Sequence, residues 1–548
     1  MSSDTPQPLR HRDATWRHLR DEVFDLLVIG GGVNGAAIAR DAVLRGMSVA
    51  LIERRDFASG TSSRSSKLIH GGVRYLEHGE LGLVLEACRE RDLLRTRLAP
   101  HLVRAQPFIF PIYDDDTMPL WQLRAGLTAY DLLAGLRNVN THHMLSRAQL
   151  CEREPALLAD GLRGGALYYD CWTDDARLTL DTALAARSGG AAVMNYTEVV
   201  ALEKDSAGRL AAARLRDQVA GRSTRVRARC FINVAGPWLD HIRRLDDQGA
   251  PPRLKVTKGV HAVFDRSRIG NRDAIVIRGA DDRRVMFAIP WQDQSLVGTT
   301  DTYYDADPAD VAADADDIDY ILAAANRAFP NADLTARDVI STYAGLRPLV
   351  APEDETEESD VSRDDKIFES PAGLISLGGG KLTTHRHVAE RIVDVAAERL
   401  GRRVGRCRTA SVPLPSAAGM IPGSVLDEPP ASGEEHVRAR YGAMASEVAA
   451  CAHDDAALAR PVVADLPDLR VEVAYAVEHQ MAMTLEDVLA RRLHVHLRSQ
   501  QRGPAVAAEV ASIMAGLLGW DDEHKAEELA AYERLLAESS GDPPGPRF

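Results

Sequence analysis

The sequence predicts an α/β fold with a mostly parallel sheet, a second β-rich region inserted into it, and helices toward the C-terminal end. Strand-like and helix-periodic apolar runs alternate near the N-terminus, two later apolar runs end at glycines, and the sequence after residue 435 is helical. With 548 residues, the chain is too long for one hydrophobic core and indicates two or three domains.

The first predicted elements are a strand, a helix and a second strand. Residues 24–29 are a short apolar run typical of a buried strand, residues 33–45 have helical spacing, and residues 49–52 are a second apolar run. This order is that of a β-α-β unit, whose two strands lie parallel in one sheet.

Three glycines at the first strand-to-helix turn indicate a nucleotide site. Gly30, Gly32 and Gly35 satisfy the pattern G-x-G-x-x-G. The first glycine permits the tight turn, the second lets a pyrophosphate approach backbone N–H groups, and the third lets helix and strand pack closely. Glu53 closes the second strand, where an acid is expected to bind a ribose 2′-hydroxyl. Together these features predict a dinucleotide-binding domain.

Two later buried strands are predicted at residues 229–234 and 374–377, and a long helix at residues 384–400. We therefore predict one dinucleotide domain whose strands are dispersed along the chain, with a substrate domain inserted twice. Near the C-terminal end, Thr484 and Asp487 have capping-box spacing and predict the start of a helix. The predicted organisation is a polar N-terminal tail (1–20), the dinucleotide domain (21–400) with insertions at about 100–170 and 250–340, a linker (401–435), a helical domain (436–538) and a disordered tail (539–548).

Composition narrows the class of protein. A net charge of −14 argues against nucleic acid as a partner, because such binding needs a basic face. The six cysteines are scattered without a C-x-x-C pair, so we expect neither a metal site nor disulfides, and a reducing compartment. The N-terminus has no secretory apolar region, and no run of about 18 apolar residues is present to span a bilayer. We expect a cytoplasmic protein, with attachment to a membrane surface left open.

A hydroxyl-rich loop follows the second strand, at residues 61–72 (TSSRSSKLIHGG). Its hydroxyl groups can hydrogen-bond a pyrophosphate, and its glycines can bring backbone close to a flavin ring. A serine-rich stretch is more often a plain surface loop, so this stretch alone does not indicate a cofactor site.

Other motifs along the chain, in a fixed order, support a cofactor-binding role for this loop. The run SSRSSKLIHGGVRY at residues 62–75 resembles the signature of FAD-dependent glycerol-3-phosphate dehydrogenases. Six further motifs resemble that family in its order: residues 169–178, 233–238, 258–261, 298–301, 345–348 and 378–384. The resemblance covers residues from about 24 to 390, and residues 475–492 resemble part of the family's C-terminal domain.

The resemblance implies an FAD-binding fold like that of D-amino-acid oxidase, with an inserted mixed-sheet substrate domain and a C-terminal helical domain. It implies FAD as cofactor and oxidation of sn-glycerol 3-phosphate to dihydroxyacetone phosphate, with electrons passed to membrane quinone. It further implies a peripheral protein on the inner face of the cell membrane, while a homodimer stays open. The N-terminal extension and details of the C-terminal region depart from the family pattern.

Site residues follow from the same motifs. For the substrate, Arg74 and Arg347 are expected to grip the phosphate, Tyr75 to offer a hydroxyl, and Lys381 to approach both flavin and substrate. A surface ion pair for each arginine and simple packing for Tyr75 are the alternatives. The residues expected to bind FAD are Gly30, Gly32, Gly35, Glu53, Thr61, Ser62, Ser63, Ser66, Lys67, Leu68, Gly236 and Thr383.

His261 is the predicted catalytic base, acting with Arg347 and Lys381. An ordinary histidine pKa of about 6.5 leaves the ring neutral and able to accept a proton at cytoplasmic pH. Lys381, deprotonated by desolvation, is the alternative base. Asp174 and Asp175 are interpreted instead as a structural ion-pair turn with Arg177.

One helical stretch, residues 121–137, admits two interpretations. Its apolar residues recur at helical spacing, notably Leu123 and Leu127, so it is either a membrane-interface helix or a core helix. Three other functions compete with a quinone-linked dehydrogenase: a soluble oxidase that uses oxygen, a redox-silent FAD scaffold or sensor, and a nicotinamide-dependent dehydrogenase.

Overall fold

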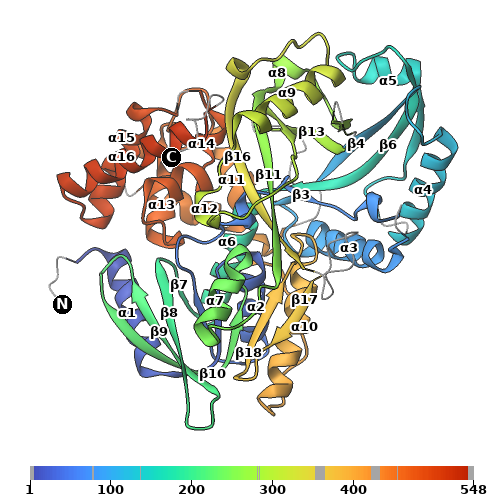
Figure 1. Ribbon diagram of the computed structural model, residues 1–548. Helices are drawn as coiled ribbons and strands as arrows, with labels where there is room; N and C mark the ends of the chain where they lie inside the picture. The colour runs from blue at the N-terminus through green and yellow to red at the C-terminus, as the bar shows by residue number, and fades with distance from the viewer. Residues whose placement is uncertain are drawn as a thin grey trace.

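The structure is a computed structural model that describes residues 5–76, 79–135, 138–279, 282, 284–351, 365–420, 432–452, 455–500 and 502–540, without the side chains of Arg74 and Tyr75. Two sheets and a group of C-terminal helices make up the molecule (Figure 1). The predicted tail at 541–548 and residues 421–431 of the predicted linker lie outside the described residues.

The first sheet contains the predicted β-α-β unit and both later strands. Five of its strands run parallel in the order β18-β10-β1-β2-β7, and β17 pairs antiparallel with β18 at one edge. β8 and β9 extend β10 as an antiparallel ribbon. The bounds are β1 Val23–Ile29, β2 Val49–Ile52, β7 Ala192–Met194, β8 Thr197–Lys204, β9 Leu210–Asp217, β10 Ser223–Asn233, β17 Lys366–Glu369 and β18 Leu374–Gly378.

Helices cover both faces of this sheet, so its central strands are apolar on both sides. On one face α2 (Val33–Leu44) lies between α6 (Asp175–Ser188) and α10 (His385–Arg399). On the other face pack α1 (Gln7–Asp21) and α7 (Leu239–Asp246).

The predicted polar tail at residues 1–20 is wrong for its described part, because α1 is a packed helix. Trp16 and Leu19 are buried against the sheet, and the buried Arg12 donates to Asp217 at 2.6 Å. Only one narrow stripe of α1 is apolar, which explains why its sequence looks like that of a tail.

The second sheet is mixed, with the strand order β15-β11-β14-β13-β12-β4-β6-β3, where β16 adds to β11 and β5 to β6. Most of its strands lie in or beside the two segments assigned to the substrate domain. They are β3 Leu68–Ile69, β4 Val103–Tyr113, β5 His143–Ser146, β6 Leu162–Thr173, β11 Leu254–Asp265, β12 Ala274–Arg278, β13 Val285–Trp291, β14 Gln294–Gly298, β15 Thr302–Tyr303 and β16 Val339–Val350. The helices beside this sheet are α3 Leu81–Leu93, α4 Leu120–Leu133, α5 Arg147–Arg153, α8 Arg266–Ile269 and α9 Ala315–Ala328.

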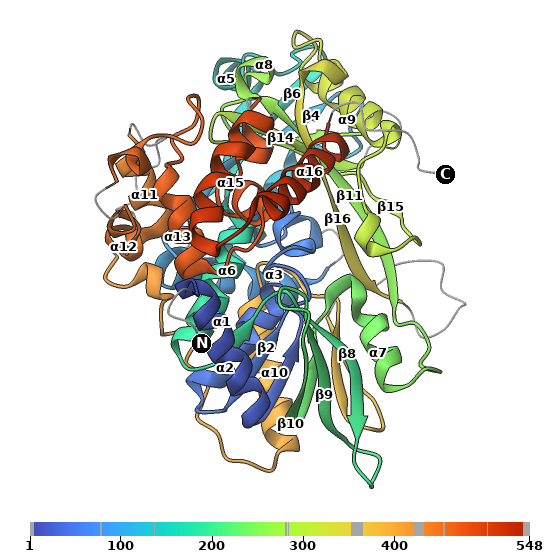
Figure 2. The ribbon, with the colours of Figure 1, turned by 90° about the vertical axis from the view of Figure 1, so that its left-hand side faces the viewer.

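The C-terminal helices form a third group with its own apolar core, seen in front in Figure 2. They are α11 Gly433–Tyr441, α12 Ala445–Ala450, α13 Arg470–Gln480, α14 Val495–Arg498, α15 Pro504–Leu518 and α16 Asp522–Glu538. The predicted capping box is confirmed: the N–H of Asp487 donates to the Thr484 hydroxyl, and the N–H of Thr484 donates to the Asp487 carboxylate. Among the described residues, no helix combines the length and apolarity needed to cross a bilayer.

Buried charges join this group to the first sheet. Asp56, just after β2, accepts from Arg491 at 2.7 Å and from Arg492 at 2.6 and 2.8 Å. Removing one partner of such a pair is strongly destabilising, because it leaves an uncompensated buried charge.

Candidate functional site

The glycine turn has the geometry that a dinucleotide requires. Gly30 has φ +116°, which side chains rarely adopt, and a Cβ at Gly35 would collide with the Gly30 carbonyl oxygen. The chain therefore turns sharply after β1, and α2 starts close against the strand. This arrangement directs the N-terminus of α2, with its free N–H groups, to the carboxyl edge of the sheet.

Glu53 lies beside this turn at the end of β2. Its carboxylate accepts from the N–H of Gly31 at 2.6 Å and from the N–H of Arg55 at 2.8 Å. Burial raises the pKa of Glu53, while these two N–H donors lower it. The Glu53 side chain is thus held at the end of β2, where an acidic residue was predicted to bind the ribose 2′-hydroxyl.

A cavity of about 210 Å³ opens along this carboxyl edge. Its wall combines the glycine turn with residues after β2 and β10, as ligand sites of open α/β sheets do. The predicted FAD residues that line it are Gly30, Gly32, Glu53, Thr61, Ser62 and Gly236. Sequence reasoning missed Asn34, Arg54 and Trp238 in the same wall: Asn34 fills a variable position of the glycine pattern, Trp238 ends the motif at residues 233–238, and Arg54 belongs to neither.

A second cavity of about 1130 Å³ adjoins the first and shares Thr61, Ser65, Lys381 and other residues with it. It lies between the two sheets, because residues that follow β18 of the first sheet and residues of β11, β12 and β16 of the second sheet both line it. The predicted residues that line it are Thr61, Ser66, Leu68, His261, Arg347, Lys381 and Thr383. The structure thus brings the predicted base, one predicted phosphate ligand (Arg347) and the predicted substrate-binding Lys381 to one space beside the smaller cavity.

The hydroxyl loop of residues 61–72 joins the two cavities. The Thr61 hydroxyl donates to the Leu346 carbonyl at 2.6 Å, and the Ser62 hydroxyl accepts from the N–H of Val33 at 3.0 Å, at the first residue of α2. Ser63 and Lys67, predicted to contact FAD, line neither cavity. The Lys67 amine is instead buried and pairs with Asp175 at 2.7 Å.

His261 is buried on β11, and its ring stacks on Tyr343 with 4.9 Å between centroids. Its Nε2 lies 2.9 Å from the Ser66 hydroxyl. Burial, with the charges of Arg347 and Lys67 adding to it, lowers the pKa of His261 to about 3. The ring is therefore neutral at pH values near 7, but the expectation of an ordinary pKa near 6.5 is wrong.

Arg347 reaches the cavity from β16 through a space that a glycine leaves open. A Cβ at Gly259 would collide with the Arg347 guanidinium. Its Nη1 lies 3.0 Å from the Asp301 carboxylate, and its Nη2 donates to the Thr299 hydroxyl at 2.9 Å. A bound phosphate would share this guanidinium with Asp301. Arg74 and Tyr75 lie in the 3-10 turn Val73–Leu76, and their side chains are outside the described part.

The cavity also contains two arginines and a histidine that sequence reasoning missed. Arg278, Arg284 and His70 line it together with the predicted Lys381. Burial lowers the pKa of His70, so it is a second neutral ring in the same space. His70 stands inside the matched motif and could have been singled out there, whereas Arg278 and Arg284 carry no sequence signal.

Asp174 and Asp175 have structural partners, but the predicted ion pairing of this turn with Arg177 is wrong. Asp174 caps α6 by accepting from the N–H of Arg177 at 2.9 Å. The Arg177 guanidinium does not pair with either of them and lies over the Tyr441 ring, 4.5 Å from its centroid.

The structure assigns a core face to the helix at residues 121–137. Leu123 and Leu127 of α4 are buried, so they cannot contact a membrane in this fold. Trp121 and Leu132 lie on the opposite face, with 72% and 63% of their surfaces exposed. Residues 136 and 137 lie outside the described residues.

The fold and the paired cavities define a flavoprotein oxidoreductase. The family model for FAD-dependent oxidoreductases matches residues 25–438, and the model described as the C-terminal domain of alpha-glycerophosphate oxidase matches residues 407–525. FAD is therefore the cofactor of this fold.

Relatives specify the family within that class. A glycerol-3-phosphate dehydrogenase of Mycobacterium leprae is 41% identical in an alignment of 547 positions that covers 96% of this chain and 91% of that protein. An aerobic glycerol-3-phosphate dehydrogenase of Staphylococcus haemolyticus is 36% identical, covering 92% and 93%. The solved glycerol-3-phosphate dehydrogenase of Bacillus halodurans, complexed with FAD, superimposes with a TM-score of 0.81 at 32% identity, covering 98% and 99%. The chain belongs to the glycerol-3-phosphate dehydrogenase family, as its motifs suggested.

Proposed function

We propose that the protein oxidises sn-glycerol 3-phosphate to dihydroxyacetone phosphate, with FAD as hydride acceptor and membrane quinone as final electron acceptor. The observation that carries this proposal is the larger cavity, where a buried neutral histidine and several cationic side chains meet beside the dinucleotide cavity. A phosphorylated alcohol needs both, because its phosphate is an anion and its hydroxyl must lose a proton as hydride leaves carbon.

Arg347 and Lys381 bind the phosphate in this proposal. The Arg347 guanidinium can donate two parallel hydrogen bonds to phosphate oxygens, and Asp301 holds it in the orientation to do so. Lys381 follows the end of β18 and lines both cavities, so its charge serves phosphate and cofactor alike. Arg74 and Tyr75 remain proposed ligands on their motif alone.

His261 accepts the hydroxyl proton. Its ring is neutral, and Nε2 receives the proton either directly or through the Ser66 hydroxyl, which lies 2.9 Å away and also lines the cavity. Protonation places a positive charge beside the developing ketone and the phosphate, which offsets the burial that disfavours it. Lys381 is the alternative base in the same cavity.

The residues of the smaller cavity fit FAD. The glycine turn and the α2 N-terminus are suited to the pyrophosphate, Glu53 to the ribose, and Thr61, Ser62 and Gly236 surround the same space. Ser66, Leu68 and Thr383 line the larger cavity, where they would contact the flavin ring. When bound, FAD supplies the group that accepts hydride; the protein supplies position and charge.

Peripheral membrane contact is proposed for the exposed apolar side chains of α3 and α4. Leu81, Leu85, Trp121 and Leu132 are each more than half exposed, and the two helices contact each other. Leu83 of α3 and Gln122 of α4 line the larger cavity, so this surface borders its mouth. A membrane-dissolved quinone would thus reach the cavity over a short path.

Steady-state kinetics of the purified enzyme test the acceptor. The proposal predicts turnover of glycerol 3-phosphate with a soluble ubiquinone or menaquinone analogue at a rate at least tenfold above that with air-saturated buffer. Faster turnover with oxygen, accompanied by stoichiometric hydrogen peroxide, would establish the oxidase alternative. Absence of turnover with every acceptor, in protein that retains FAD, would favour a redox-silent scaffold, and turnover that requires NAD would favour a nicotinamide enzyme.

A further inference from the structure

The carboxylate of Asp175 holds the hydroxyl loop in place. Its Oδ1 accepts from the Lys67 amine at 2.7 Å and the N–H of Ala176 at 2.9 Å. Its Oδ2 accepts from the Ser65 hydroxyl at 2.7 Å and the Ser65 N–H at 3.1 Å. Asp175 is fully buried, so these four donors supply its solvation. The contacts of Asp175 also fix Ser65 and Lys67, which stand on either side of Ser66. Ser66 is the residue that contacts His261.

Aromatic rings of the second sheet hold the same loop from another side. The Lys67 amine lies 5.3 Å from the centroid of the Trp291 ring and 5.6 Å from that of Tyr343. The Tyr343 hydroxyl donates to the Ser65 carbonyl at 3.0 Å. Lys67 has φ +57°, an uncommon conformation for a residue with a side chain, which these contacts stabilise.

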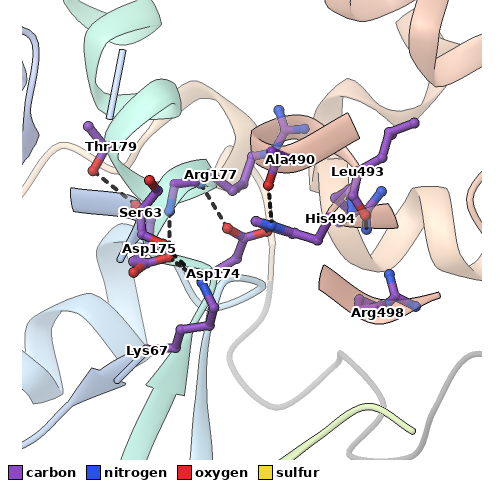
Figure 3. Close-up of polar contacts among 12 residues, drawn as sticks. Ser63, Lys67, Asp174, Asp175, Arg177, Thr179, Ala490, Leu493, His494 and Arg498 are labelled. Atoms are coloured by element: carbon purple, nitrogen blue, oxygen red, sulfur yellow. Dashed lines mark hydrogen bonds and ion pairs between the residues drawn. The ribbon is translucent and has the colours of Figure 1, made fainter. Parts of the chain in front are cut away.

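His494 brings the C-terminal helices to this cluster (Figure 3). It lies just before α14, and it is buried. Its Nε2 lies 2.9 Å from the Asp174 carboxylate and its Nδ1 lies 2.9 Å from the Ala490 carbonyl. Both partners are hydrogen-bond acceptors, so each ring nitrogen faces a group to which it can donate.

Asp174 faces this ring as a carboxylate. Burial alone would raise the pKa of Asp174, but His494, Lys67 and the N–H of Arg177 lower it well below its usual range. One oxygen of Asp174 caps α6 and the other binds His494. His494 therefore holds the very end of the helix whose first residue is Asp175.

The Trp291 ring gives a second connection between His494 and the loop. His494 packs edge to face against Trp291, with 5.6 Å between centroids. The same ring lies next to the Lys67 amine. His494 thus touches both Asp174 and Trp291, two of the groups next to the Lys67–Asp175 pair.

We propose that His494 is a positioning residue, through which the C-terminal helices hold the α6 end and the hydroxyl loop in their FAD-binding conformation. The proposal rests on FAD as cofactor and on no assumption about the substrate or the electron acceptor. It assigns the C-terminal helices a part in building the flavin site, in addition to their own packing.

The test compares His494→Ala with His496→Ala in the full-length protein, without substrate. His496 is a matched control because it stands two residues later, is equally buried, and packs on Tyr532 within the C-terminal helices, with 5.8 Å between ring centroids. The measurements are the dissociation constant of FAD from titrated apoprotein and the visible circular dichroism of bound flavin, both well below the melting temperature.

His494→Ala is expected to weaken FAD binding at least tenfold and to change the flavin dichroism, while His496→Ala lowers thermal stability and changes neither. His494→Gln, whose amide can still donate to Asp174, should recover part of the affinity. A wild-type dissociation constant and spectrum in His494→Ala would overturn the proposal; if that variant does not fold, the same result in His494→Gln would overturn it.

A double-mutant cycle tests the route through α6. Asp175→Asn alone should weaken FAD binding, because it removes the charge that holds Lys67. Added to His494→Ala, it should cost much less than it does alone, since both act on the same loop. Additive losses would show that the two residues act independently and would refute the route.

Discussion

A single methyl group at Gly35 is expected to impair FAD binding. A Cβ there would lie well inside 3.0 Å of the Gly30 carbonyl oxygen and 3.2 Å from Cγ2 of Val234. The first of these atoms belongs to the backbone of the glycine turn and cannot rotate away. Alanine therefore forces the start of α2 away from β1, and with it the N–H groups that we propose bind the pyrophosphate.

The magnitude follows from the cost of overpacking. Inserting a methyl group into a close-packed site costs about 1–3 kcal/mol. If the strain is present in the FAD-bound conformation of the turn and is relieved without FAD, this energy corresponds to FAD binding that is about 5- to 150-fold weaker. The same strain lowers the melting temperature of the holoprotein, since bound cofactor stabilises the folded state by mass action.

The assay is fluorescence titration of apoprotein with FAD, together with the flavin content of the purified protein. Gly516→Ala in α15 is the control, because nothing lies within 4 Å of a Cβ at that position. It should stabilise the helix by about 0.5–1 kcal/mol and leave FAD binding unchanged. Wild-type FAD affinity in Gly35→Ala would refute the assignment of this turn to the cofactor.

Three further predictions follow from the site and its surroundings. Arg347→Ala should raise KM for glycerol 3-phosphate about 10- to 100-fold, as expected for the loss of a charge-assisted pair, and should change the turnover of free glycerol little. The control is Arg268→Ala, which removes a half-exposed ion pair with Asp338. Equal losses on both substrates would show that Arg347 is structural. Burial, with the charges of Arg104 and Arg177 adding to it, lowers the pKa of His101 to about 3. Between pH 6.5 and 3 the unfolded chain therefore takes up a proton at this histidine that the folded protein does not. The contribution of the neutral His101 to the free energy of unfolding is complete above pH 6.5 and is lost as pH falls toward 3. His101→Leu should therefore flatten the fall of unfolding free energy between pH 6.5 and 4 by about 1 kcal/mol per pH unit in urea titrations, and an unchanged slope would contradict the burial argument. Trp121→Glu with Leu132→Glu should reduce co-flotation with liposomes, whereas Val219→Glu, on an exposed turn, should not; unchanged flotation would move the docking surface elsewhere.

The parts of the fold that were predicted are those with local signals. The strands at residues 24–29 and 374–377 are covered on both faces, so their sequences are continuously apolar and easy to recognise. The glycine turn was predictable because backbone geometry restricts which residues can stand there. His261, Arg347 and Lys381 were selected by motif, and the structure brings them to one cavity.

The contacts that were not predicted join residues far apart in the chain. Lys67 looked like a cofactor ligand, but its amine is held by Asp175, which lies more than 100 residues later. The shift in the pKa of His261 likewise depends on burial between two sheets, which no local pattern reports. The α1 helix was missed because tertiary packing of Trp16 and Leu19 against the sheet stabilises it, rather than its mostly polar sequence.

Anaerobic reduction of the bound flavin tests the central claim most directly. Purified yellow protein would be mixed with sn-glycerol 3-phosphate, its enantiomer or glycerol, without any nicotinamide, and the flavin absorbance followed by stopped flow. The account predicts rapid, complete bleaching by sn-glycerol 3-phosphate with one dihydroxyacetone phosphate formed per flavin, and at least 100-fold slower bleaching by glycerol. Flavin that stays oxidised with sn-glycerol 3-phosphate, yet is reduced by dithionite, would contradict the account.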